Sequence, residues 1–300
     1  MSITHTDTLP YKPPFKPFTM NVRGRLVEVE RPWVTAIINA TTDSFYGASR
    51  ALDESALATL VRQHLDAGAD MLDIGACSTR PGSLPPTPEE ELSRLRTAMQ
   101  TVRRIAPDIP VSVDTWRAAV AREAVETLGA DIVNDISGGD LDPEMTRTVA
   151  SLKVPYIIMH TRGTPADMAD QTDYPRGVAS DVIEMVSRKI FNLRLLGISD
   201  IIADPGFGFA KTVAQNYKLL RELPRIAATL GVPLMAGLSR KSMLWKPLQT
   251  SADDSLAATV AANTLALSAG ASFIRVHDVL AARQARDIVQ LTFSQQPHHA

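Results

Sequence analysis

Short β-rich runs alternate with longer helical patterns eight times along this chain, and this repeat is the feature that most constrains its fold. The β-rich runs cover residues 34–38, 70–75, 110–113, 131–134, 154–159, 200–203, 232–236 and 272–276. Intervening stretches such as 53–68 and 180–197 are typical of helices and end in glycine, as helix C-termini commonly do. Strands separated by helices predict parallel pairing through crossover connections. The sequence therefore favours a single (β/α)8 TIM barrel, and a doubly wound open sheet is the alternative.

The segments around this repeat define the expected domain organisation. Residues 1–21 contain several prolines and predict a flexible N-terminal extension. Residues 22–293 would form the barrel domain, and 294–300 a C-terminal tail. The stretch 22–30 alternates polar and apolar residues, which predicts a β-hairpin that closes the bottom of the barrel. No long polar linker divides the repeat, so one domain is expected.

Composition and charge narrow the classes of function. The chain is 45% hydrophobic and 21% charged, with a formal net charge of −2, so it lacks the basic footprint of proteins that bind nucleic acid or anionic membranes. Its single cysteine, Cys77, excludes an internal disulfide framework and a cysteine-rich zinc site, which fits a reducing cytoplasm. No apolar run approaches the roughly 20 residues that span a bilayer. Small-molecule chemistry is favoured.

The stretch "IIADPGFGFAKT", residues 201–212, raises the question of a phosphate-binding loop. The Walker A pattern requires glycines at the positions held here by Pro205 and Ala210. The dinucleotide pattern starts at Gly206 and Gly208, but Lys211 stands where its third glycine should be. Neither pattern fits, so the stretch is interpreted with the polar residues that follow the other strands.

Each predicted strand ends in at least one polar or ionisable residue. In a TIM barrel the C-terminal ends of the strands meet at one rim, where the active site lies. The candidates, in chain order, are Asn39, the 75–82 loop with Thr79 and Arg80, Asp114, Asn134, His160, Asp204, the 237–242 loop with Lys241, and Arg275 with His277. Together they predict a site at this rim.

Taken singly, these residues have structural alternatives. Asp114 and Asp204 have the residue type that caps helices, and His160 and His277 are each open to a structural, hydrogen-bonded role. Arginines such as Arg80 and Arg275 are common surface charges, and Cys77 is typical of a small packed thiol. Arg275 and His277 nevertheless share one face of a strand, because side chains alternate with a period of two.

The candidates fall into two chemical sets. Asp114, Asn134, Asp204 and Lys241 offer hydrogen-bonding groups suited to a flat nitrogen heterocycle. Arg80, Arg275 and His277 suit phosphate oxygens, and Asn39 offers an oxygen to a hard metal ion. No convincing Ser-His-Asp or Cys-His arrangement is present, so no protein nucleophile is expected.

An ordered series of motifs resembles the dihydropteroate synthase family from about residue 33 to 290. These motifs are "NATTDSF", "STRPG", "SVDT", "NDISGG", "MH", "DPGFGFAKT", "LSRKS" and "RVHD". The resemblance implies a TIM-barrel enzyme that joins 6-hydroxymethyl-7,8-dihydropterin diphosphate to 4-aminobenzoate and releases pyrophosphate. It also implies Mg²⁺ as cofactor, a homodimer, and a pterin-binding role for the loop that starts at Asp204. The chain departs from the family at Thr42, where proline is common, and at Cys77, where glutamate is usual.

The resemblance also implies a role for each matching residue. Asn39 would coordinate Mg²⁺. The diphosphate would be held by Arg80, Arg275 and His277, and the pterin by Asp114, Asn134, Met159, Asp204 and Lys241. The aminobenzoate slot would be shaped by Thr79, Pro81, Phe209 and Ser242.

Two alternative functions stand beside this one. The first is a pterin-binding methyltransferase that passes a methyl group from a folate to a corrinoid protein on the same kind of barrel. Such an enzyme expels no diphosphate and should not need "STRPG", "SRK" and "RVHD" together. The second is a pterin-binding paralogue without turnover, against which the intact set of charged residues argues.

Overall fold

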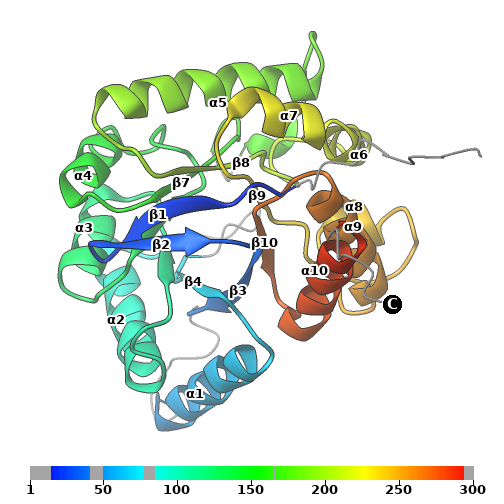
Figure 1. Cartoon of the computed structure of the whole chain (residues 1–300). Coiled ribbons are helices and arrows are strands. Elements are labelled where there is room, and N and C mark those ends of the chain that lie inside the picture. The colour runs from blue at the N-terminus through cyan, green and yellow to red at the C-terminus, as the bar shows by residue number, and fades with distance from the viewer. Residues whose placement is uncertain (1–14, 41–49, 78–84, 165–166, 294–300) are drawn as a thin grey trace, which may run out of the picture.

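The computed structural model describes residues 15–40, 50–77, 85–164 and 167–293, and within these ranges eight parallel strands form one sheet (Figure 1). In chain order these strands are β3 (Trp33–Asn39), β4 (Met71–Gly75), β5 (Val111–Asp114), β6 (Ile132–Asp135), β7 (Tyr156–Met159), β8 (Ile201–Asp204), β9 (Met235–Ala236) and β10 (Phe273–Val276). They pair in the order β8-β7-β6-β5-β4-β3-β10-β9. A bridge between Ala203 and Leu234 joins the two outer strands. The sheet is therefore closed, which confirms the predicted TIM barrel and excludes the open sheet.

Helices surround the barrel. They are α1 (Arg50–Asp66), α2 (Pro88–Ile105), α3 (Ala118–Glu126), α4 (Met145–Leu152), the 3₁₀ turn η3 (Met168–Asp170), α5 (Val178–Leu195), α6 (Val213–Arg221), α7 (Leu223–Leu230), α8 (Ser242–Trp245), α9 (Leu256–Ser268) and α10 (Val279–Phe293). Local sequence explains several starts: Thr87 caps α2 and exchanges hydrogen bonds with Glu90, and Thr212 does the same for α6 with Gln215. Within the described ranges, no helix has the length and apolar character needed to cross a membrane.

Alternation along each strand divides the apolar residues into two layers. Outward positions such as Val34, Leu72 and Ile274 join the large cluster that packs against the helices. Inward positions near the strand starts form a second cluster, made of Trp33, Met71, Ile132, Ile157, Ile202, Met235 and Phe273. We call these seven residues the barrel floor. The ring of Phe273 packs edge-on against Trp33, with 5.8 Å between centroids. The floor fills the lower half of the barrel, as layered side chains do in this fold.

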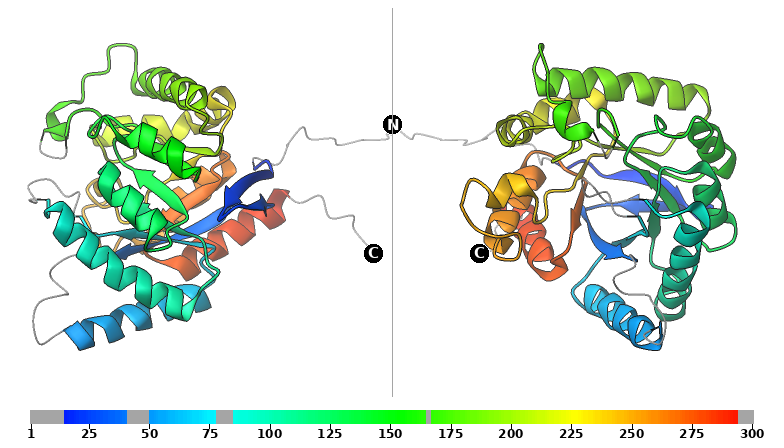
Figure 2. Two further views of the ribbon diagram at one scale, coloured as in Figure 1. Left: turned by 90° about the vertical axis from the view of Figure 1, so that its left-hand side faces the viewer. Right: turned by 180° about the vertical axis from the view of Figure 1, so that it is seen from behind.

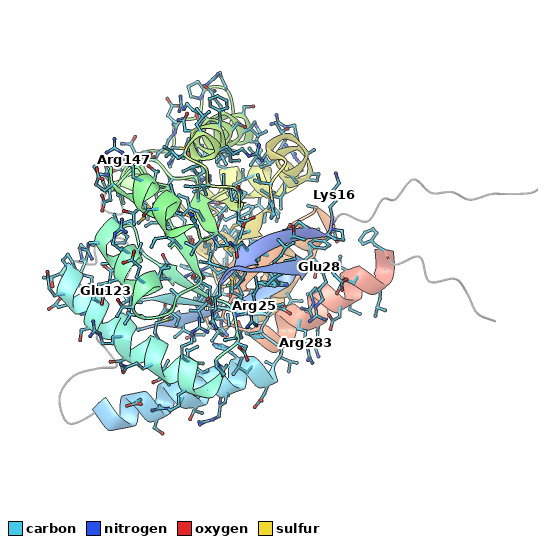
Figure 3. All side chains as sticks on the ribbon, turned by 60° about the vertical axis from the view of Figure 1, so that its left-hand side comes forward. Lys16, Arg25, Glu28, Glu123, Arg147 and Arg283 are labelled. Carbon is cyan, nitrogen blue, oxygen red and sulfur yellow. The ribbon has the colours of Figure 1, made fainter. Side chains whose placement is uncertain are left out.

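A β-hairpin covers the floor from outside the barrel. Its strands β1 (Phe18–Val22) and β2 (Arg25–Val29) meet at Arg23 and Gly24, whose φ angles of 53° and 71° are typical of a tight hairpin turn. Met20, Val22 and Val29 pack into the floor cluster. The hairpin lies at one end of the barrel (Figure 2). The exposed Arg25 and Glu28 lie on its outer side (Figure 3).

The hairpin confirms the prediction for residues 22–30 but begins earlier than expected. Residues 18–21, assigned to a flexible extension, form most of β1. They are ordered because Met20 is buried against the floor, and because the backbone N–H of Asn21 donates to Asp200 at 2.9 Å. The prolines of the segment all precede residue 18, so β1 pairs without a missing donor.

Candidate functional site

A layer of polar side chains lies directly above the barrel floor. Two residues after each floor residue, the same strand again points inward, because side chains alternate along a strand. These positions hold Thr35, Asp73, Asn134, Met159, Asp204, Gly237 and Arg275. In six of the seven strands, the inward side chain is therefore large and apolar in the floor and polar or small two residues further along. The sequence builds an apolar floor and, above it toward the C-terminal end of the barrel, a polar layer of inward side chains, which we call the polar chamber.

A fully buried carboxylate, Asp73, links the polar layer from its centre. It accepts a hydrogen bond from Asn134 Nδ2 at 3.1 Å and one from the hydroxyl of Ser112. Arg275 Nε donates to Asp73 Oδ2 at 2.6 Å, and Arg275 Nη2 donates to Asp114 Oδ2 at 2.9 Å. One guanidinium therefore joins two carboxylates from neighbouring strands. The result is a connected ionic network across β4, β5, β6 and β10.

Asp204 and Lys241 stand on the other side of Arg275. A side chain at Gly237 would lie 3.7 Å from Asp204 Oδ2, 3.7 Å from Lys241 Nζ and 4.0 Å from Arg275 Cβ. Lys241 Nζ donates to the carbonyl of Phe207 and lies 4.8 Å from the ring centroid of Phe209. Asp204, Lys241 and Arg275 therefore lie around Gly237, each at ordinary contact distance from a Cβ there.

Burial changes the proton affinities of this cluster. Burial raises the pKa of Asp114 to about 7, although Arg275 opposes the change. The pKa of Asp204 is also raised by burial, against the effect of Lys241. Burial lowers the pKa of Lys241 to about 8, with Asp204 acting in the opposite direction. Carboxylates with raised pKa values beside an ammonium with a lowered pKa are typical of a functional site.

The ends of β9 and β10 are tied to each other above the chamber. Arg240 donates through Nε and Nη2 to the two carboxylate oxygens of Asp278, at 2.9 and 2.8 Å. The hydroxyl of Ser239 lies 3.0 Å from Nδ1 of His277 and accepts from the His277 backbone N–H at 3.2 Å. The motifs "LSRKS" and "RVHD", distant in sequence, are thus one structural unit that presents the exposed His277 at the rim.

The structure brings most of the predicted residues together. Asp114, Asn134, Asp204, Lys241 and Arg275 share the chamber, and Met159 is buried at its inward position on β7. Asn39 is the exposed last residue of β3. Phe209, in the loop after β8, and Ser242, the first residue of α8, are half-buried. Thr79, Arg80 and Pro81 lie outside the described residues. The roles of all these residues stay predictions.

Two candidates have structural roles. His160 is fully buried and hydrogen-bonded to Lys211 and Asp181, as its structural alternative requires. Cys77 is half-buried, and burial together with Glu91 raises the pKa of its thiol to about 12. Because the thiolate is the reactive form, this cysteine is unsuited to nucleophilic chemistry near neutral pH.

Asp73 is the site residue that sequence reasoning missed. The run "DMLDIG" predicts only a buried strand, whereas the candidate site residues follow the strand ends. The sequence does contain a signal for Asp73. It is an ionisable residue between two apolar residues, and it lies two positions after Met71, so both side chains point to the same face of the strand. Burying a carboxylate costs free energy unless a charged group pairs with it. Arg275 lies two positions after the floor residue Phe273 on β10, so its side chain also points into the barrel and can pair with Asp73.

The donor set bears on whether the site holds a resident metal ion. Within the described ranges, no group of three or more His, Cys, Asp or Glu side chains is arranged to hold one. Asn39 offers a single amide oxygen at the exposed rim. One oxygen fits Mg²⁺ that keeps most of its water and arrives with substrate phosphates, because Mg²⁺ is commonly bound in that way.

Comparisons with known proteins agree on one family. Residues 35–277 match the model of the pterin binding enzymes. A dihydropteroate synthase from Synechocystis is 41% identical over 261 residues, which cover 85% of this chain and 88% of the relative. The structure of Xanthomonas albilineans dihydropteroate synthase with 4-aminobenzoic acid superposes with a TM-score of 0.84 at 34% identity, covering 94% of this chain and all of that one. The same enzyme in complex with 7,8-dihydropteroate gives a TM-score of 0.81 at 33% identity, covering 93% and 100% of the two chains.

The ionic network predicts a large loss of stability when Asp73 is neutralised. Asp73→Asn should lower the free energy of unfolding by about 3 kcal/mol, because it leaves Arg275 partly uncompensated. The same change in an Arg275→Met background should cost clearly less, since the two residues interact directly. Urea denaturation followed by circular dichroism measures both.

The matched control is Glu144→Gln, which removes the exposed ion pair with Arg147. Its effect should stay within about 1 kcal/mol. An Asp73→Asn loss no larger than this control, or equal losses in both backgrounds, would contradict the stabilising role of the network.

Proposed function

The chain belongs to the family of pterin-binding enzymes, among the dihydropteroate synthases, and from this premise we propose how its own residues carry the reaction. A dihydropteroate synthase joins 6-hydroxymethyl-7,8-dihydropterin diphosphate to 4-aminobenzoate and releases pyrophosphate in folate biosynthesis. This transferase function is the function of the chain. The observation that carries the site assignment is the polar chamber in which Asp73, Asp114, Asn134, Asp204 and Lys241 surround Arg275.

The chamber suits the pterin. A pterin presents ring and amino N–H donors along one edge, and the carboxylates of Asp114 and Asp204 accept such donors. The amide of Asn134 and the ammonium of Lys241 supply donors for the ring nitrogen and carbonyl. Met159 offers an apolar surface next to them. Because the chamber stands on a dry floor, each of these hydrogen bonds forms in a poorly solvated place and discriminates strongly.

The diphosphate would lie at the rim, above Arg275. His277 is exposed there, directly after the end of β10, and Arg80 follows β4 in the sequence. Both are placed by chain order to meet phosphate oxygens. Mg²⁺ bound with the diphosphate at Asn39 would neutralise part of the leaving group's negative charge.

Bond changes follow from this arrangement. The bond between the pterin methylene and the diphosphate oxygen breaks, and its electron pair leaves with pyrophosphate. Arg275 stabilises that departing charge as a cation, and His277 as a neutral hydrogen-bond donor, because desolvation and the nearby Arg275 lower the pKa of His277 to about 4. The carboxylates of Asp114 and Asp204 favour the cationic pterin that remains. The amine of aminobenzoate then forms the new carbon–nitrogen bond and loses one proton.

The second substrate would enter between the loops. Phe209 faces Lys241 on one side, and Ser242 is the next residue after Lys241. The aromatic ring suits the aryl group of aminobenzoate, and the hydroxyl of Ser242 suits its carboxylate. Thr79 and Pro81 would complete the slot.

The methyltransferase alternative lacks support, because the matched relatives are named dihydropteroate synthases. The cytoplasmic location expected from the single cysteine stays a prediction.

Turnover tests the assignment directly. The protein should release pyrophosphate only when the pterin diphosphate and aminobenzoate are both present with Mg²⁺, which separates it from a binding paralogue.

Asp204→Asn should weaken pterin binding about 5- to 150-fold, since unpaired N–H groups cost about 1 to 3 kcal/mol each. Isothermal titration measures the affinity. Asp142→Asn is the control, because Asp142 accepts from the backbone N–H of Ala118 instead. Equal pterin affinity in wild type and Asp204→Asn would exclude Asp204 from the site.

Pterin affinity should follow a bell-shaped pH profile. Asp114, with a pKa of about 7, must lose its proton to accept N–H donors, so affinity rises with pH up to that value. Lys241, with a pKa of about 8, loses its charge above that value, so affinity then falls. Each limb should change by up to about tenfold per pH unit. Titration with 6-hydroxymethyl-7,8-dihydropterin avoids the protons of the diphosphate. Asp114→Asn should abolish the rising limb; its persistence in that variant would assign the limb to another group.

We propose a homodimer that forms through the outer faces of α9 and α10, which lie side by side (Figure 1). These faces expose Leu265, Ile288 and Leu291 to 59, 61 and 66%. Exposed apolar side chains on two helices that pack together are typical of interfaces. Leu265→Glu combined with Ile288→Glu should therefore convert a dimer to a monomer in sedimentation velocity. Phe191→Glu is the control, because Phe191 is equally exposed on α5, which packs on α6 and α7. A wild-type chain that sediments as a monomer would contradict the dimer.

A further inference from the structure

Lys211, in the connection between β8 and α6, is buried, although a lysine after a glycine-rich stretch raises the question of a phosphate loop. Its side chain is 9% exposed. Nζ donates to the carbonyls of Gly206 at 2.8 Å and Phe209 at 2.9 Å, and it lies 3.0 Å from Nδ1 of His160. All the partners belong to its own loop or to the end of β7. The ammonium therefore points into the protein, where it gathers the loop's backbone.

The imidazole of His160 orients this ammonium. Burial and the nearby Lys211 lower the pKa of His160 to about 4, so the ring is neutral near pH 7. Burial lowers the pKa of Lys211 to about 7, so the tautomer is set from the other side of the ring. The hydrogen bond with His160 lowers the pKa of Asp181, whose carboxylate can only accept, so Nε2–H donates to Asp181 Oδ1 at 3.1 Å and Nδ1 accepts from Lys211. Asp181 also pairs with Arg162, whose guanidinium lies 4.2 Å from the ring centroid of Tyr174. The chain from Lys211 to the start of α5 is thus fixed at each link.

The loop held by Lys211 carries three contacts to the site. The backbone N–H of Gly206 donates to Asp204 Oδ1 at 2.7 Å. The carbonyl of Phe207 accepts from Lys241, and the ring of Phe209 faces the same ammonium. Lys211 donates to the carbonyls of Gly206 and Phe209, the first and last residues of the segment that makes these contacts. A shift of the loop would move the Phe207 carbonyl and the Phe209 ring together.

The loop has an unusual backbone that needs such support. Gly206 has a φ of +73°, and a side chain there would lie 1.9 Å from the carbonyl oxygen of His160. Gly208 has a φ of +81°, and Ala210 reaches +51° without being glycine. The hydroxyl of Tyr174 donates to the Ala210 carbonyl at 2.9 Å. Left-handed residues at alternate positions leave carbonyls pointing inward, and a buried ammonium satisfies several of them at once.

We propose that Lys211 is a positioning residue for the second substrate: held by His160 and Asp181, it fixes the β8–α6 loop so that Phe209 and Lys241 form one wall of the aromatic amine's slot. This inference rests on the proposed function. An apolar residue of similar length would fill the same space without the cost of burying a charge. The lysine's particular contribution is therefore the placement of the loop carbonyls.

Steady-state kinetics with Lys211→Met test the proposal, because methionine keeps the length and removes the donors. The KM for aminobenzoate should rise at least fivefold. The KM for the pterin diphosphate should rise less, because Asp204 and Lys241 belong to β8 and to the N-cap of α8 and only contact the loop. His160→Leu should have the same effect. His160→Gln should restore near wild-type KM values, because glutamine again offers an acceptor to Lys211 and a donor to Asp181.

Lys189→Met is the matched control. Lys189 also donates to loop carbonyls, those of Ser137 and Gly138, but in the loop that follows β6. It should leave the aminobenzoate KM unchanged. Should Lys211→Met not fold, Asp181→Asn gives the same readout, since it weakens the link to His160 while leaving Lys211 in place.

Two outcomes would overturn the inference. One is an aminobenzoate KM within twofold of wild type in the folded variants. The other is an equal rise of both KM values, which would mean a general loss of structure. Wild-type turnover is measured in the same assay, so a failure of the proposed function appears as no pyrophosphate release in wild type. A failure of this inference appears only in the variants.

Discussion

The ion pair between Asp73 and Arg275 is the interaction on which the site depends. It joins the second and last strands of the barrel across its interior, and it lies one side-chain layer above an apolar floor. Charges in such a place persist only when each has a close partner and its remaining hydrogen-bonding capacity is used. Asn134, Ser112 and Asp114 complete the set. The groups proposed to bind the pterin are therefore held by one another before any ligand arrives.

The apolar floor contributes stability that offsets the free-energy cost of burying these charges. Seven inward side chains and the hairpin's Met20, Val22 and Val29 form a dry apolar layer at the N-terminal end of the barrel. Apolar burial there, and between the strands and the helices, supplies the stability that the polar chamber costs. The division follows from strand geometry, since a step of two residues moves from one layer to the next without changing the face. It agrees with the general pattern that the lower end of a TIM barrel serves stability and the upper end serves chemistry.

Charged groups, together with buried apolar side chains such as Phe207 and Leu238, hold the rim loops in place. Arg240 fastens the end of β9 to the end of β10 through Asp278, and Lys211 gathers the loop after β8. Loops at a functional rim must expose polar atoms to a ligand, so they have few apolar side chains with which to pack. Buried or half-buried cations with several donors satisfy the carbonyls of such loops and keep their geometry. The proposed pterin and aminobenzoate sites meet at Lys241, which contacts the loop after β8 and belongs to the connection after β9.

The sequence by itself determined the barrel, because eight alternations of strand and helix admit few closed arrangements, and the predicted strands all occur. It also determined the rim candidates, since Asp114, Asn134, Asp204 and Arg275 lie at or beside strand ends. Tertiary structure alone decided that Asp73 stands at the centre of the network and that Lys211 faces inward. Each depends on a partner far along the chain or on a loop's backbone angles. Local pattern records periodicity, whereas the pairing of buried charges is set by which strands and loops meet in space.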